Sequence, residues 1–333
     1  MKQLQASEIL VHKVFSSDFD FRIPEYQRPY AWGPEQAGQL LEDVTEAMGR
    51  SADEPYFLGS VVLVKEPGSP SAEVIDGQQR LTTLTILFAV LRDLADNDEL
   101  RAELAALITE PGRLIQSLEP KPRLALRPRD REFFGVHVQT VGSIPNLLAV
   151  RPDALKTDAQ QAVQANASHF WKVLSEWSSA DRLGLVQRLS TQTMLVVVST
   201  PDLSSAHRIF SVMNARGLDL SPTDIFKATV IGGLPESESE LYAGKWEGAE
   251  EDLGRGPFLE LFLHLRTIES KTRARRELLK SFRNKCSTSI CRTVKRRSSM
   301  TFSFPTQKRS RSSLPGTTNP QPGRRGSISG FDD

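Results

Sequence analysis

The stretch that most constrains the fold of this chain is EVIDGQQRLTTLTIL, residues 73–87. An apolar segment typical of a buried strand ends at Ile75, and leucines recur at helical spacing from Leu84 onwards. Asp76 and Gly77 lie between the two segments, and glycine accepts the positive φ of a tight turn. The sequence therefore predicts a strand that passes through a glycine turn directly into a helix.

Such a joint is suited to bind an anion, because the first N–H groups of a helix have no partner within it and carry partial positive charge. Gln78 and Gln79 add amide donors, and Arg80 adds a guanidinium group that matches phosphate. Two threonines add hydroxyl groups one turn later. We therefore predict that a nucleotide binds here. The nucleotide-binding residues of this stretch would be Gly77, Gln78, Arg80, Thr82 and Thr83.

Asp76 is the carboxylate of the same joint, and it could hold Mg²⁺ or orient a water molecule. The alternative is that Asp76 and Gly77 form only a turn and that the polar side chains after them are solvated. The joint is not a P-loop, because the chain contains no GxxxxGK[ST] pattern.

A second polar segment, IPEYQRPYAWG, alternates aromatic and hydrogen-bonding side chains between prolines, and it should form an ordered loop after a strand. Gln27 and Arg28 can contact base edges or phosphates, and an aromatic ring such as that of Tyr26 can stack on a base. The alternative is a loop whose aromatic side chains, Tyr30 and Trp32 above all, complete the core. We predict that Gln27 and Arg28 carry the function of this segment.

A third segment, RIFSVMNARGLDLSPTDIFKATVIG, places Asn214 before a glycine that ends one helix and Lys227 one turn into the next. Ser221, Pro222 and Asp224 match an N-cap, a first-turn proline and a capping-box acid, so a structural role for Asp224 is the simpler interpretation. Asn214 and Lys227 have no such role. We predict that they line a polar cleft and contribute to nucleotide binding; the alternative is that both are exposed polar residues.

The order of the predicted elements indicates an α/β (α+β) protein in two domains. Residues 1–95 mix strands and helices and form the first domain. Residues 96–283 are mainly helical, include a buried strand at TQTMLVVVST, and would complete the cleft.

Residues 284–333 differ in character, because they are rich in Ser, Thr, Arg and Pro and show no sustained helical or strand period. A segment of this composition cannot bury enough apolar surface to offset the entropy of ordering. It is either a disordered basic tail or the product of a reading-frame shift. The abrupt appearance of both cysteines, Cys286 and Cys291, favours the second interpretation.

Composition limits the remaining functions. The 42 Lys+Arg and 41 Asp+Glu residues nearly cancel, so any contact with DNA must come from local basic patches. No segment approaches the roughly 18–20 apolar residues of a transmembrane helix, and the N-terminus lacks the pattern of a signal peptide. We therefore expect a cytoplasmic protein without membrane partners.

Four motifs together, IPEYQRPYAW, FLGSVVL, VIDGQQRLTTL and IFSVMNARGLDLSPTDIFK, resemble the N-terminal domain of GmrSD-type modification-dependent (type IV) restriction proteins, which SspE proteins of anti-phage defence share. The resemblance runs from about residue 7 to about residue 283. It implies a ParB/sulfiredoxin-like domain whose strand–Gly–x–x–Arg–helix joint, here Gly77 and Arg80, binds nucleotide phosphates. It also implies that the DGQQR stretch supports hydrolysis, with Asp76, Gln79 and Arg80 as catalytic residues. The YQR stretch, here Tyr26, Gln27 and Arg28, would sense modified DNA.

Full-length members of this family usually continue into a C-terminal His-Asn-His nuclease domain, whereas residues 284–333 contain no histidine. Nuclease activity is therefore not expected of this chain alone, and a separate nuclease domain or subunit would be a partner. We expect an NTP-binding and NTP-hydrolysing, Mg²⁺-dependent subunit that senses DNA. The alternatives are a non-catalytic nucleotide- or DNA-binding module and a truncated inactive remnant.

Overall fold

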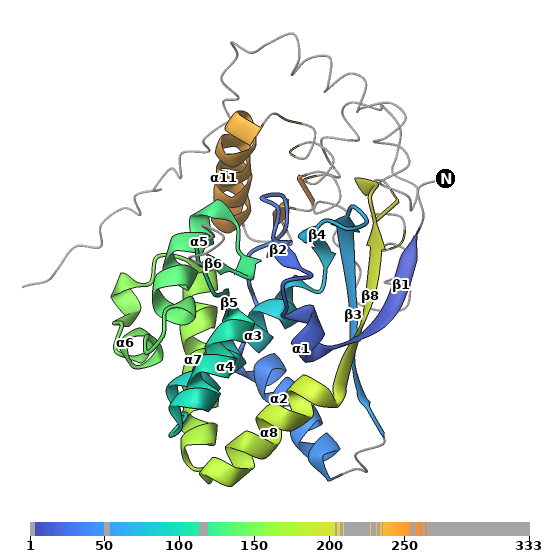
Figure 1. The fold of residues 1–333 in the computed structure, drawn as a ribbon. Coiled ribbons are helices and arrows are strands. Elements are labelled where there is room, and N and C mark those ends of the chain that lie inside the picture. The colour runs from blue at the N-terminus through green and yellow to red at the C-terminus, as the bar shows by residue number, and fades with distance from the viewer. Residues whose placement is uncertain are drawn as a thin grey trace, which may run out of the picture. The chain divides into compact units, whose positions relative to one another are not determined.

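A mixed six-stranded sheet lies beside a layer of helices (Figure 1). The computed structural model describes residues 4–49, 54–112 and 119–203, and parts of the chain between residues 205 and 264. Across the sheet the strands follow the order β1 (Gln5–Leu10), β8 (Thr193–Thr200), β3 (Tyr56–Lys65), β4 (Ser71–Asp76), β2 (Asp20–Arg22) and β7 (Leu124–Ala125). β1 and β8 are antiparallel, as are β3 and β4, and the other neighbours are parallel. A separate antiparallel pair joins β5 (Thr109–Glu110) to β6 (Lys121–Pro122).

Both faces of the strands β3 and β4 are covered. Successive side chains of a strand point to opposite faces. In β3, Val61 and Leu63 belong to the larger apolar core, whereas Val62 between them belongs to a smaller core. β4 divides in the same way between Val74 and Ile75. Burial on both faces explains why these strands have nearly continuous apolar sequences.

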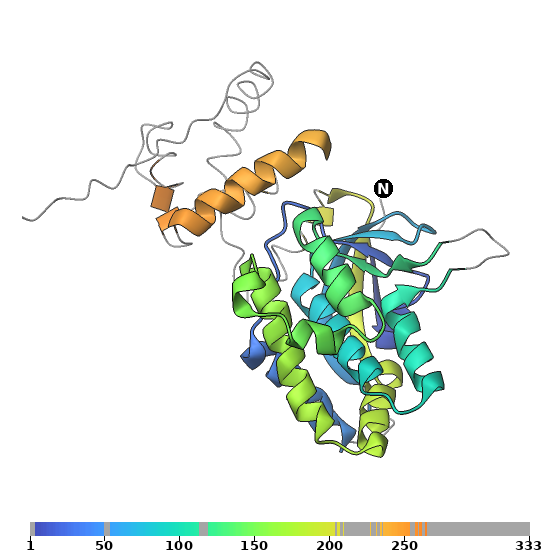
Figure 2. The same ribbon diagram turned by 90° about the vertical axis from the view of Figure 1, so that its left-hand side faces the viewer.

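The larger core lies between one face of the sheet and a layer of helices (Figures 1 and 2). The helices in chain order are α1 (Val11–Val14), α2 (Pro34–Met48), α3 (Gln78–Asp93), α4 (Asp98–Ile108), α5 (Pro128–Phe134), α6 (Ile144–Leu148), α7 (Asp158–Ser175) and α8 (Ser179–Thr191). Two short turns, the π-helical η2 (Gly135–Gln139) and the 3-10 helical η3 (Pro152–Ala154), flank α6. Helix α11 (Glu236–Leu253) contributes Ala243 to the smaller core.

Helix α3 is the central helix of this layer and is buried on every side. The leucine spacing predicted one apolar face, and Leu84 and Leu87 are indeed fully buried. The structure also buries Thr82, Thr83 and Thr85, because α4 and α7 pack against α3 as well. Threonine hydroxyls can satisfy themselves within a helix, as Thr85 does by donating to the Leu81 carbonyl oxygen at 2.9 Å.

The structure confirms the mixed α/β class that the sequence predicted. The strand expected at TQTMLVVVST is β8, and it lies between β1 and β3. The domain boundary expected near residue 95 therefore falls inside one shared sheet and one shared core. The tail expected at residues 284–333 lies outside the described residues. Within the described part of the chain, no helix is long and apolar enough to span a membrane.

Candidate functional site

The predicted strand-to-helix joint is present, because β4 ends at Asp76 and α3 begins at Gln78. Gly77 between them has a φ of +93° and forms the N-cap of α3. A Cβ atom at this position would lie 2.9 Å from Val61 Cγ2 and 3.2 Å from the Ser60 carbonyl oxygen. The backbone conformation and the close approach of β3 therefore both require glycine here.

Gln79 binds the YQR loop, by which we mean residues 23–33. Its Oε1 atom accepts hydrogen bonds from the backbone N–H groups of Ala31 at 2.8 Å and Trp32 at 3.1 Å. Its Nε2 atom donates to the Pro29 carbonyl oxygen at 3.1 Å. The side chain is only 5% exposed. The side-chain amide of Gln79, which the sequence predicted to be catalytic, thus forms its hydrogen bonds with the backbone of the YQR loop in this structure.

Two more glutamines connect the loop to the joint. Gln78, which is buried, donates from Nε2 to the Arg28 carbonyl oxygen at 3.0 Å. Gln27 donates in the opposite direction, from its Nε2 atom to the carbonyl oxygen of Ile75 at 3.0 Å. The loop is therefore fastened to the end of β4 and to the start of α3 by amide side chains from both partners.

A buried chain of polar groups continues this attachment. Thr83 Oγ1 donates to the Gln79 carbonyl oxygen at 2.8 Å, which leaves the Tyr30 hydroxyl to donate to Thr83 Oγ1 at 2.7 Å. Asn166 Nδ2 donates in turn to the Tyr30 hydroxyl oxygen at 2.6 Å. Burial raises the pKa of Tyr30 to about 12, so the phenol stays neutral. Thr83, and likewise the buried Thr82, lie inside this packing.

Three charged side chains interact at the joint: Asp76, Arg80 and Arg28. Asp76 and Arg80 are partly buried, and Arg28 is exposed. Burial raises the pKa of Asp76, while the Gly77 N–H group and the positive charges of Arg80 and Arg28 oppose that rise. The joint therefore offers one desolvated carboxylate within electrostatic reach of two guanidinium groups.

Arg80 is positioned by β3. Its Nη1 atom donates to the Ser60 carbonyl oxygen at 2.9 Å. The guanidinium group crosses Gly59, where a Cβ atom would lie 2.8 Å from Arg80 Cζ. Burial lowers the pKa of Arg80, and the charge of Asp76 opposes that change. One edge of this guanidinium is thus held by backbone.

Of the three residues predicted to sense DNA, Arg28 alone is exposed. Tyr26 is 7% exposed and belongs to the smaller core with Val62 and Ile75. Its pKa is raised by burial and by the nearby negative charge of Glu73. Gln27 is half-buried and anchors the loop.

A cavity of about 10 Å³ lies between the YQR loop, the start of α3 and α5. Its lining includes Arg28, Gln78, Thr82, Arg127 and Asp130. It has room for about one water molecule and none for a nucleotide. A phosphate group could therefore enter this side of the joint only if a neighbouring element moves.

A buried group of charged residues adjoins that cavity, and sequence reasoning missed most of it. Arg127 donates to Asp130 Oδ2 at 2.6 Å and also to Glu247 of α11. Lys227 donates to Glu247 Oε1 at 2.9 Å. The i,i+3 spacing of Arg127 and Asp130 was a local signal for their ion pair. No such signal marked Glu247, because its partners lie 120 and 20 residues earlier in the chain.

Lys227 is thus a buried member of this group, 2% exposed, and not an exposed polar residue. Asn214 and Asp224, the other residues singled out in that segment, lie outside the described residues.

The fit of Mg²⁺ to the site rests on Asp76. The described residues contain no group of three or more His, Cys, Asp or Glu side chains that could hold a metal ion. Mg²⁺ at nucleotide sites commonly takes only one or two protein carboxylates and completes its shell with phosphate oxygens and water. A single carboxylate at Asp76 fits that pattern.

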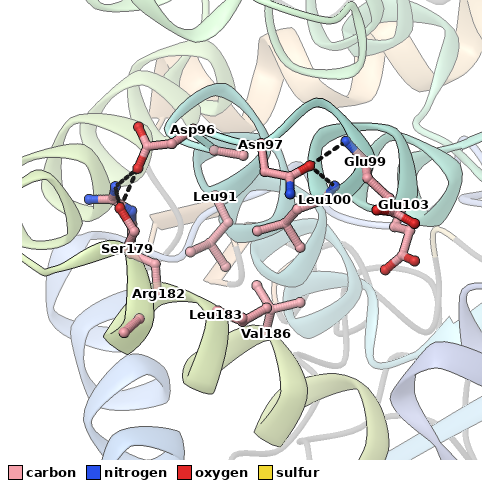
Figure 3. Close-up of a pocket in the computed structure, with 12 residues that line it drawn as sticks. Leu91, Asp96, Asn97, Glu99, Leu100, Glu103, Ser179, Arg182, Leu183 and Val186 are labelled. Carbon is pink, nitrogen blue, oxygen red and sulfur yellow. Dashed lines mark hydrogen bonds and ion pairs between the residues drawn. The ribbon is translucent and has the colours of Figure 1, made fainter.

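A larger cavity of about 360 Å³ lies away from the joint, between α8 and the region where α3 ends and α4 begins (Figure 3). Leu91, Leu183 and Val186 contribute apolar surface, and Glu99 and Glu103 add carboxylates. Carboxylates repel phosphate, and none of the predicted site residues lines this cavity.

The mixed sheet and the glycine turn that leads into α3 define an α/β protein in which a polar loop is fastened to a strand-to-helix joint. Comparison with protein families identifies it further: residues 11–231 match the family described as GmrSD restriction endonuclease, N-terminal domain. The match covers well over half of the chain and includes the joint, the YQR loop and Lys227, so the chain belongs to this family. The family acts in DNA restriction, for which DNA is the target. No curated protein matches the chain.

Proposed function

We propose that this chain binds and hydrolyses a nucleoside triphosphate at the joint between β4 and α3 and senses DNA through the YQR loop, as part of a modification-dependent restriction system. The observation that carries the proposal is the trio Arg28, Asp76 and Arg80 at a helix start that no described side chain caps. Free helix N–H groups and two guanidinium groups favour a polyphosphate.

The side chains of the DGQQR stretch have different roles in this proposal. Arg80 and the backbone N–H groups around Gly77 contact phosphate, as in the ParB/sulfiredoxin-like joint that the sequence resembles. Gln78 and Gln79 hold the YQR loop in place through the contacts described above. Gln79 is then a positioning residue.

Asp76 is the residue that would hold Mg²⁺, with phosphate oxygens and water as the remaining ligands. Bound there, Mg²⁺ would neutralise charge on the phosphate oxygens. The charges of Arg28 and Arg80 act on Asp76 and oppose the rise in its pKa that burial causes. The carboxylate and the two guanidinium groups can therefore share one polyphosphate.

The YQR loop gives this proposal a route from nucleotide to DNA. Arg28 is exposed and can contact DNA phosphate, while its own carbonyl oxygen is bound by Gln78 of the joint. A change at the joint would therefore move the exposed part of the loop. DNA cleavage would fall to a separate nuclease domain or subunit.

The test is triphosphate hydrolysis by the purified chain with Mg²⁺, measured with and without modified and unmodified DNA. Asp76→Asn keeps the size of the side chain and removes its charge, and we expect hydrolysis to fall at least about a hundredfold. Asp18→Asn makes the same change at an exposed position and should leave the rate unaltered. Equal rates for the two variants would refute the role of Asp76. Nucleotide binding without product release would instead support the alternative of a non-catalytic nucleotide-binding module.

The pH profile provides a second readout of the same assay. Burial raises the pKa of Asp76, so the carboxylate takes up a proton at a higher pH than an ordinary aspartate does. If hydrolysis requires the ionised form, kcat/KM, which reports groups of the free protein, should fall on acidification above the usual aspartate range near about 4. A profile that stays flat down to that range would contradict the assignment.

A further inference from the structure

One carboxylate oxygen of Asp130 in α5 has no hydrogen-bond partner among the described residues. Arg127 donates to the other oxygen, Oδ2, from Nη2 at 2.6 Å and from Nε at 3.1 Å. The unpartnered oxygen, Oδ1, is buried, and the whole side chain is only 7% exposed. A buried carboxylate oxygen without a donor is costly. A donor from outside the described protein groups is therefore expected at Oδ1.

Asp130 lines the small cavity of about 10 Å³ between α5, the YQR loop and the start of α3. A water molecule needs at least about 10–15 Å³ of space measured in this way. The cavity therefore matches the size of one water molecule. A hydrated metal ion, which carries several water molecules, is too large for it.

Helix α3 supplies two further polar groups to the lining, Gln78 Oε1 and the Thr82 hydroxyl. Both side chains are buried, with exposures of 8% and 2%. Gln78 donates from Nε2 to the Arg28 carbonyl oxygen, but no hydrogen bond joins its Oε1 atom or the Thr82 hydroxyl to another described residue. Thr83 and Thr85 differ, because each donates to a carbonyl oxygen of its own helix. The lining thus offers two acceptors and one hydroxyl donor, which are the partners that a water molecule requires.

We infer that this cavity binds one buried water molecule that bridges α5 and α3. The water donates to Asp130 Oδ1 and to Gln78 Oε1, and it accepts from the Thr82 hydroxyl. A monovalent cation fits less well, because Arg28 and Arg127 both line the cavity and would repel it. A neutral donor satisfies the carboxylate oxygen without adding charge.

The bridge gives the YQR loop a second connection to α3. Arg127, which Asp130 Oδ2 orients, donates from Nη1 to the Gln27 carbonyl oxygen at 3.4 Å. The loop is thus held directly by the two glutamines of the joint and indirectly by Arg127, Asp130 and the water. Asp130 is therefore a positioning residue for the loop. This inference does not depend on the binding of nucleotide or DNA.

A crystal structure of the full chain, at a resolution that shows ordered water, tests the site directly. We expect one peak of density in the cavity, within hydrogen-bond distance of Asp130 Oδ1 and Thr82 Oγ1. A cavity without density, or one filled by a side chain, overturns the inference. A crystal soaked in rubidium chloride separates water from a cation, since an anomalous peak in the cavity would overturn the assignment as water.

Hydrogen exchange of the full chain tests the bridge in solution. Thr82→Val keeps the shape of the side chain and removes the hydroxyl, so the YQR loop should exchange at least about threefold faster. Thr82→Ser retains the hydroxyl and should exchange like the unaltered protein. Thr85→Val is the matched control, because it removes an equally buried hydroxyl that bonds only within α3. Equal exchange of the loop in Thr82→Val and Thr85→Val overturns the bridge.

Discussion

Two constraints act on Gly77, its positive φ and the close approach of β3. Gly68, in the turn between β3 and β4, shares the first constraint, with a φ of +79°. Around its position for a Cβ atom, however, no described atom lies within 4 Å, whereas Val61 Cγ2 lies 2.9 Å from the corresponding position at Gly77. The two glycines therefore separate the cost of the backbone conformation from the cost of steric overlap.

Alanine at each position should reveal that difference. Gly68→Ala should lower the free energy of unfolding by about 1 kcal/mol, the cost of a left-handed conformation for a residue with a Cβ atom. Gly77→Ala should lower it by about 2–3 kcal/mol more, because Val61 or the β3 backbone must shift. Urea unfolding followed by circular dichroism measures both. Equal losses would mean that the joint can relax around a side chain.

Sequence alone could place the joint but not the partners of its side chains. Glycine at position 77 and the helix after it follow from local rules and were predicted. Gln78 and Gln79 were expected to face a ligand, and their buried contacts with the YQR loop were not foreseen. An amide has the same donors and acceptors for a phosphate as for a backbone group, so its chemistry does not identify its partner. The loop residues that it binds lie 47–50 positions earlier in the chain.

At the scale of elements, the end of α3 is held by Arg92, the largest fully buried side chain of the core. Its guanidinium group donates to the carbonyl oxygens of Val138 and Gln139, both at 3.1 Å, and of Thr140 at 2.7 Å. Asp93 completes the arrangement by pairing with Arg92 Nε at 2.7 Å. One arginine thus satisfies the C-terminal carbonyl groups of η2, which have no partner within that short turn.

Arg92→Ala should therefore destabilise the protein strongly. It leaves three carbonyl groups without their donor and removes the ion pair of Asp93, whose carboxylate keeps only the N–H groups of Gly142 and Ile144. We expect a loss of about 3–5 kcal/mol in the free energy of unfolding. Arg151→Ala breaks an exposed pair with Asp153 and should cost about 0–1 kcal/mol. Thermal unfolding of the two variants compares them directly. A melting temperature of Arg92→Ala close to that of Arg151→Ala would show that these carbonyl groups find other donors.

The elements themselves were largely predictable, because helix spacing and β-branched runs are local. The structure confirms the strands β3, β4 and β8 and the helices α2 and α3 where the sequence predicted them. Their arrangement was not predictable. β8 begins more than a hundred residues after β3 and yet pairs with it, and strand pairing over such separations leaves no mark in local composition. The same reasoning explains why Glu247 was missed.

At the scale of the whole molecule, the continuity of the sheet depends on β8, which lies between β1 and β3. β8 pairs with β1 on one side and with β3 on the other, so it joins the first strand of the sheet to the rest. Its Leu195 and Val197 belong to the larger core together with Val61 and Leu63 of β3. Residues 1–95 without β8 would leave the adjoining edges of β1 and β3 unpaired and part of the core uncovered.

A fragment of residues 1–95 should consequently fail to fold on its own, while a fragment of residues 1–283 keeps every described residue and should unfold like the full chain. Differential scanning calorimetry distinguishes the outcomes, since a cooperative transition requires a complete core. We expect no transition for the short fragment and an unchanged melting temperature for the long one. If the short fragment unfolded cooperatively, residues 1–95 would be an independent domain, and β8 would be an addition to a sheet that is stable without it. The joint between β4 and α3 would then form without the helical part of the chain.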